Sequence, residues 1–85
     1  SNLGETDYSV INGNFAQEGG LAPSSDGLAV ESPANNPSVN VLVWKTSVSG
    51  DKAEAVKKLD ELLHSDQVKK YIEDTWKDGS VIPAF

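Results

Sequence analysis

Apolar and polar residues are arranged in two different ways along the chain. Residues 1–50 hold short apolar runs separated by Gly, Ser, Asn and Pro, whereas residues 51–77 are rich in Lys, Glu and Asp and place apolar residues at helical spacing. Short apolar runs between turn residues are typical of strands, and a period near 3.6 is typical of helices. The pattern predicts strands in the first half and helices in the second.

The first half contains three strand candidates, Tyr8–Asn12, Leu28–Val30 and Val39–Lys45. Five of the seven residues in the last candidate are apolar, which is typical of a strand covered on both faces. Residues 31–38, with two prolines, predict a loop that crosses between elements.

Between the first two strand candidates, Phe15–Glu18 predicts a short helical turn. Gly19 and Gly20 follow it and can end a helix because glycine readily adopts positive φ. Residues 22–27, Ala-Pro-Ser-Ser-Asp-Gly, have the composition of a turn.

The second half predicts two helices. Asp51 followed by Glu54 forms a capping-box pattern with Asp51 as the N-cap, and Ser65 can cap a second helix that ends near Gly79. A terminal tail, residues 80–85, is apolar and expected to be extended. The apolar faces of the two helices are predicted to be Val56, Leu59, Leu62 and Leu63, and then Val68, Tyr71, Ile72, Thr75 and Trp76.

Composition narrows the possible functions. The 85 residues carry thirteen acids against seven lysines and no arginine, for a net charge of −6. Nucleic acid is a poor partner for such a chain, because Lys and Arg on phosphates supply most of that affinity. With no cysteine there is no thiolate metal site or disulfide, and the single histidine, His64, has no neighbouring second ligand. We expect no metal and no cofactor, and a structural role for His64.

Two asparagines stand at the ends of apolar runs, Asn12 after Val-Ile and Asn40 before Val-Leu-Val. An amide both donates and accepts hydrogen bonds without a charge, which suits a zwitterionic small ligand. Structural alternatives exist for each: Asn12-Gly13 is also a hairpin-turn dipeptide, Asn14 can be a helix N-cap, and a buried Asn40 can be satisfied within the protein. No nucleophile and base lie in a pattern that predicts catalysis, so we expect a binding protein and not an enzyme.

The order of motifs resembles a known family. A strand ending Val-Ile-Asn is followed by Leu-x-Pro-x-x-Asp-Gly, Glu-Ser-Pro, Val-Asn-Val-Leu-Val, Leu-x-Ser-Asp-x-Val-Lys-Lys-Tyr-Ile and Gly-Ser-Val-Ile-Pro-Ala-Phe. Residues 4–85 resemble the C-terminal part of the NlpA-type methionine-binding lipoproteins, the substrate-binding components of bacterial methionine ABC importers.

The resemblance implies an α/β fold of the two-lobe, type II periplasmic-binding-protein kind, closing on L-methionine or a close analogue. It implies that Asn12 and Asn40 contact the ligand, and Asn14 is a weaker candidate. It also implies a lipid anchor outside the cytoplasm, an ABC transporter permease as partner, and an arginine and aromatic residues from the rest of the protein at the ligand. Ser38 departs from the family, which has an aromatic residue there.

We therefore expect a single fragment, with a strand- and turn-rich cleft segment at 1–38 and a strand, helix pair and apolar tail at 39–85. Its apolar surface is expected to meet the remainder of its own two-lobe protein or to form a homo-oligomer. The rival interpretation is a small protein–protein interaction module that uses the helix pair and the tail. A lipobox cysteine and an arginine-bearing lobe upstream would favour the binding protein.

Overall fold

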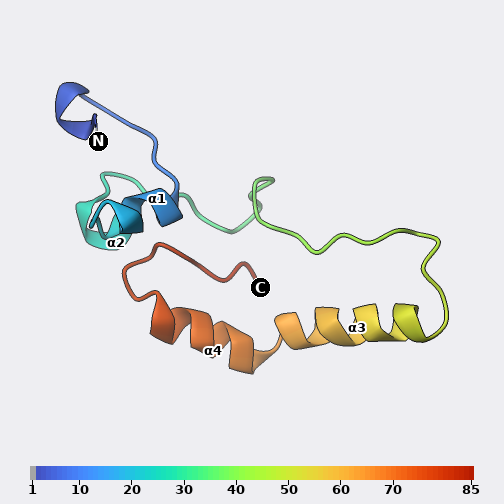
Figure 1. Ribbon diagram of the computed structural model, residues 1–85. Helices are drawn as coiled ribbons and strands as arrows, with labels where there is room; N and C mark the ends of the chain where they lie inside the picture. Colours follow the sequence, from blue (N-terminus) through green and yellow to red (C-terminus); the bar gives the residue numbers. More distant parts are fainter. Residues whose placement is uncertain (1) are drawn as a thin grey trace.

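Local backbone hydrogen bonds dominate the computed structural model, which describes residues 2–85. Its elements are a 3₁₀ turn η1 (Leu3–Glu5) and the helices α1 (Gly13–Glu18), α2 (Pro23–Asp26), α3 (Asp51–Leu63) and α4 (Asp66–Thr75). Figure 1 shows α1 and α2 together at one end of the molecule and α3 and α4 end to end along one side. None of these helices is long and apolar enough to cross a membrane.

The α/β fold class predicted from the sequence is wrong for this structure, because residues 2–85 contain no strand. The three segments predicted as strands, Tyr8–Asn12, Leu28–Val30 and Val39–Lys45, carry no ladder hydrogen bonds. A helix forms its hydrogen bonds within one segment, whereas a strand needs a second segment beside it. No two of the three segments pair, so each remains without regular structure.

The second half agrees with the sequence more closely. Both predicted helices are present, and Ser65 caps α4 as predicted, with its Oγ 3.3 Å from the amide of Val68. The predicted cap of α3 is wrong: Gly50 takes the N-cap position at φ 62°, and Asp51 is the first helical residue. The two helices of the expected helix pair follow one another along a line in Figure 1.

The first half also contains helical structure at a predicted turn. Phe15–Glu18 is helical as predicted and belongs to α1, which ends before Gly19 and Gly20, the latter at φ 77°. The segment predicted as a turn at 22–27 contains the one-turn helix α2, which begins at Pro23. Proline is favoured at the first helical position because its missing amide would have no partner there.

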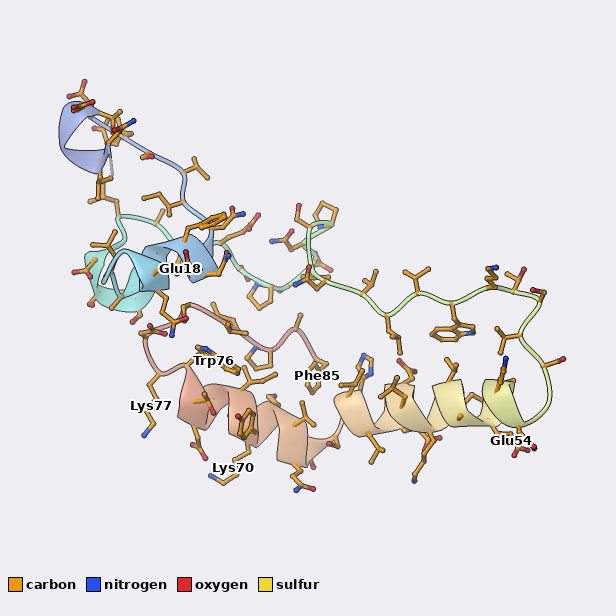
Figure 2. The ribbon with its side chains drawn as sticks, viewed as in Figure 1. Glu18, Glu54, Lys70, Trp76, Lys77 and Phe85 are labelled. Carbon is orange, nitrogen blue, oxygen red and sulfur yellow. The ribbon has the colours of Figure 1, made fainter. Side chains whose placement is uncertain are left out.

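Very little of the molecule is buried. Ala16 is the buried hydrophobic residue of the described chain, and the radius of gyration is 16.7 Å, with extents of 54 × 26 × 23 Å. A compact domain of this length would have a radius of gyration of about 12 Å. Figure 2 shows the same property, with side chains spread along an open ribbon. The structure therefore presents its apolar residues as surface.

A turn after α4 contacts the helices of the first half of the chain. The amide of Ser24 in α2 donates to the carbonyl oxygen of Asp78 at 3.0 Å, and Gly13 lies so close to the carbonyl of Ser80 that a Cβ would not fit. Beyond the turn, residues 80–85 run back along α4 as an extended tail (Figure 1). The tail is extended as predicted, and its contacts are with this chain's own helices.

Candidate ligand-binding residues

Asn12 lies at the N-cap of α1. Its carbonyl oxygen accepts the amide of Ala16 at 2.9 Å, and its φ and ψ of −65° and 145° are those of extended backbone. The hairpin-turn alternative for Asn12-Gly13 is therefore wrong, since Gly13 is the first residue of a helix. The side chain of Asn12 is exposed and makes no capping hydrogen bond. Its amide is available to a ligand.

Asn14 is the second residue of α1, so its interpretation as the N-cap is wrong. α1 has six residues, and the side chain of Asn14 is exposed on it. The N-cap is two residues earlier, at Asn12, because Gly13 is already the first residue of the helix. The role of Asn14 at a ligand stays a prediction.

Asn40 lies in the extended segment after the predicted crossing loop, and its side chain is exposed. A different amide organises that loop: Asn36 accepts the amide of Ser38 at 2.8 Å through Oδ1 and donates to the carbonyl of Ser32 at 3.0 Å through Nδ2. Asn35 adopts φ 55°, which asparagine tolerates better than most residues. The structural alternative of a buried, internally satisfied Asn40 does not apply here.

Two shallow hollows lie on the part of the surface that the structure describes. The first, about 370 Å³, lies between η1 and α1 and has a wall of mixed polar and apolar residues, and the second, about 350 Å³, lies between α4 and the tail. None of Asn12, Asn14 and Asn40 lines either hollow. The first is lined by Asn2, Leu3, Gly4, Thr6, Ser9, Ile11, Phe15, Ala16, Gly19 and Leu21; the second by Lys69, Glu73, Trp76, Lys77, Gly79, Val81, Ile82 and Pro83.

The best-defined polar arrangement is the turn at Asp78. Its Oδ1 accepts the hydroxyl of Ser80 at 2.7 Å and the amide of Ser80 at 3.0 Å, and these hydrogen bonds lower the pKa of the Asp78 carboxyl. Gly79 adopts φ 77° between them. The sequence pattern predicts Asp78-Gly79 only as the end of a helix. An aspartate two residues before a serine is the signal for such a turn, because the carboxylate can accept the amide two residues on.

Charged side chains elsewhere lie on the surface. The Lys70 ammonium donates to Asp74 at 2.8 Å, which raises the pKa of Lys70 and lowers the pKa of Asp74, chiefly through this hydrogen bond. His64 ends α3 with Nδ1 2.7 Å from the carbonyl oxygen of Asp60, and its ring meets the Phe85 ring edge-on at 5.2 Å. Residues 2–85 contain no group of His, Asp and Glu side chains able to hold a metal ion. The structural role expected for His64 stays a prediction.

These residues can offer hydrogen bonds to a polar ligand, and the comparisons with known proteins indicate the class of protein. The sequence profile of the NlpA lipoprotein family matches residues 1–85, so the chain belongs to that family. The resemblance found in the sequence is confirmed.

Two curated relatives are similar over nearly the whole chain. A methionine-binding lipoprotein, MetQ, from Bacillus subtilis is 39% identical over 80 residues, which are 93% of this chain and 28% of the relative. A membrane lipoprotein, TpN32, from Treponema pallidum is 41% identical over 81 residues, 94% of this chain and 29% of the relative. The chain thus spans just over a quarter of these relatives. No solved structure matches it.

Proposed function

We propose that this chain supplies part of the ligand cleft of a substrate-binding lipoprotein that delivers methionine, or a close analogue, to an ABC importer. The observation that supports this most directly is the NlpA family match over residues 1–85, together with the methionine-binding name of the Bacillus subtilis relative. No chemical step is proposed. The protein holds its ligand and releases it to the transporter permease.

The proposed contacts are amide hydrogen bonds. Asn12 and Asn40 have exposed side chains that serve as donors to a carboxylate and acceptors from an ammonium. Asn14, the second residue of α1, is a weaker third contact. The strongest carboxylate partner would be a bidentate arginine, and this chain has none. We therefore place that partner, and the wall around the ligand side chain, in the part of the relatives that this chain does not match.

The location and partners follow from the same proposal. In the full-length protein a lipid would anchor the binding protein outside the cytoplasmic membrane, beside the permease. The remaining three quarters of a family member would complete the cleft. Neutral amides inside a closed cleft suit a zwitterion because they pair its two charged groups. A buried polar group left unpaired there costs about 1–3 kcal/mol when it is neutral, and more when it is charged.

A chimera tests this proposal. In the Bacillus subtilis relative, the region that is similar to this chain over 80 residues would be replaced by the corresponding residues of this chain. Isothermal titration calorimetry should then detect L-methionine binding. Asn12→Ala and Asn40→Ala should each weaken it on the order of tenfold, equivalent to about 1.4 kcal/mol.

Two exposed glutamines provide matched controls, because each also loses one amide. Gln17→Ala in α1 and Gln67→Ala in α4 should leave the affinity unchanged. A folded chimera with no methionine binding, or one in which all four variants bind alike, would contradict the proposal.

A further inference from the structure

Asn12 and Gly13 form a dipeptide whose own atoms can react with one another. In an Asn-Gly pair, the backbone nitrogen of the glycine can attack the side-chain carbonyl carbon of the asparagine and close a succinimide ring. Glycine favours this reaction because it has no Cβ to crowd the nitrogen and because its backbone is conformationally permissive. Asn12-Gly13 is the only Asn-Gly pair in the sequence.

Both reacting groups are free of hydrogen bonds in the structure. The Asn12 side chain is exposed and makes no capping hydrogen bond to α1. Gly13 is the first residue of α1, where an amide has no acceptor within the helix. Among residues 2–85, the Gly13 amide also donates to no backbone carbonyl outside α1. Neither group therefore has to give up a partner before the ring closes.

The backbone before Asn12 allows the rotation that ring closure needs. Asn12 has a ψ of 145°, which turns the Gly13 nitrogen away from the side-chain carbonyl carbon, so the chain must rotate about the Cα–C bond of Asn12. Residues 7–11 carry no backbone hydrogen bond in the described chain, and Val10 is fully exposed. This segment can swing while α1 stays in place, with Gly13 still packed against the carbonyl of Ser80.

The other asparagines lack this combination, because each precedes a residue whose side chain crowds the attacking nitrogen. Asn36 precedes a proline, which has no N–H, and its side chain already makes two hydrogen bonds. Asn40 precedes a β-branched valine, and Asn14 precedes a phenylalanine inside α1. Sequence and structure together favour reaction at Asn12.

We propose that Asn12 is a site of spontaneous deamidation in the folded chain. The Gly13 amide loses its proton to water, its nitrogen forms a bond to the side-chain carbonyl carbon of Asn12, and the side-chain amino group leaves as ammonia. Water then adds to a ring carbonyl and breaks the bond between that carbonyl and the ring nitrogen. Opening at the side-chain carbonyl gives aspartate, and opening at the main-chain carbonyl gives isoaspartate. Water is consumed and ammonia is released, and nothing is oxidised or reduced.

The product changes what position 12 can bind. An amide both donates and accepts hydrogen bonds, whereas a carboxylate only accepts them and carries a negative charge. A ligand carboxylate that receives a hydrogen bond from Asn12 would be repelled after the reaction. This consequence rests on the proposed function, whereas the modification itself requires no ligand.

Mass spectrometry of the 85-residue chain, incubated in mildly alkaline buffer, tests the proposal. A protease that cleaves after glutamate releases residues 6–18, which contain Asn12 and Asn14. Fragment ions should locate the conversion of amide to carboxyl at Asn12, as a mixture of aspartate and isoaspartate. It should be on the order of fivefold faster than at Asn14, or more, because glycine leaves the nitrogen uncrowded. Asn12→Gln should abolish the conversion, since its longer side chain would have to close a larger ring.

Glu18→Asn provides a matched control, because it places a second Asn-Gly pair at the end of α1. There the Gly19 amide donates to the carbonyl of Phe15 at 3.0 Å and must leave this hydrogen bond before it can attack. In the folded variant, Asn12 should react on the order of fivefold faster than the substituted position, or more. In concentrated urea the two positions should react at similar rates, because the difference in hydrogen bonding is lost.

Three results would overturn the proposal. The first is an absence of conversion at Asn12 in the folded chain, and the second is an equal rate at Asn12 and Asn14. The third is an equal rate at Asn12 and at the position changed by Glu18→Asn in buffer, with circular dichroism showing the helices intact. The free amide of Gly13 would then give Asn12 no advantage.

Discussion

The amide of Ser24 donates a 3.0 Å hydrogen bond to the carbonyl oxygen of Asp78, and this contact joins α2 to the turn that follows α4. The two residues are far apart in sequence, in segments whose local patterns predict only a turn and a helix end. The Asp78 side chain holds the same turn through Ser80. Asp78 thus connects the first half of the molecule to the second.

Acid should open the Asp78 turn. Its pKa lies below the ordinary aspartate value of 3.8 because Ser80 donates two hydrogen bonds to the carboxylate. A carboxyl with a lowered pKa in the folded state stabilises that state above the unfolded pKa, and this contribution is lost as pH falls through the folded pKa. The protection factor of the Ser80 amide, which compares its exchange rate by NMR with the intrinsic rate at the same pH, should be constant near neutral pH and fall below about pH 4. Asp78→Ala should lack this protection at every pH, and Asp7→Asn should behave as the unchanged protein.

Gly13→Ala should separate α1 from the Asp78 turn. A Cβ at this position would meet the backbone carbonyl of Ser80, which cannot move as a flexible side chain could. Chemical-shift changes at Ser80 and Ser24 would report the separation. Gly4→Ala is the control, because nothing lies within 4 Å of its added Cβ. Equal shifts at Ser80 in the two variants would contradict the close packing of Gly13.

Ser65→Ala should shorten α4 from its beginning. The Ser65 hydroxyl accepts the Val68 amide, one of the first amides of the helix, which has no partner within it. Losing such a cap costs about 1 kcal/mol. Carbon chemical shifts of residues 66–69 should move toward random-coil values. Asp51→Ala should have no comparable effect at α3, since Gly50, not Asp51, is its N-cap.

The isolated 85-residue chain should bind free methionine weakly or not at all. It has no arginine for the carboxylate, and neither hollow of the structure is lined by Asn12 or Asn40. Isothermal titration calorimetry with L-methionine would check this. Micromolar binding to the isolated chain would mean that these residues form a complete site by themselves.

The helices were predictable from sequence wherever local interactions decide the structure. Ser65 caps α4 as predicted because its hydroxyl and the Val68 amide are three residues apart, within reach of each other in one turn. The glycines at 19 and 20 end α1 for a similarly local reason. Family membership was also accessible from the order of motifs, and the profile match confirmed it.

The candidate site could be predicted only as a set of residue types. Sequence patterns identified Asn12, Asn14 and Asn40 as amides beside apolar runs. They did not predict which residues lie next to these amides in space. The structure exposes all three side chains and shows that Asn12, not Asn14, is the N-cap of α1. Which of them contacts a ligand depends on distant parts of the polypeptide, and their roles stay predictions.

The sequence by itself determined α3, α4, the end of α1 and the family, because each rests on residues within a few positions of one another or on their order. Tertiary structure alone decided whether the apolar segments at 8–12, 28–30 and 39–45 became strands, and in this chain they did not. It also decided that Asp78 and Ser24 meet. The physical reason is the same in both cases: a strand or a long-range contact requires a partner segment, and a local pattern does not specify which segment will lie beside it.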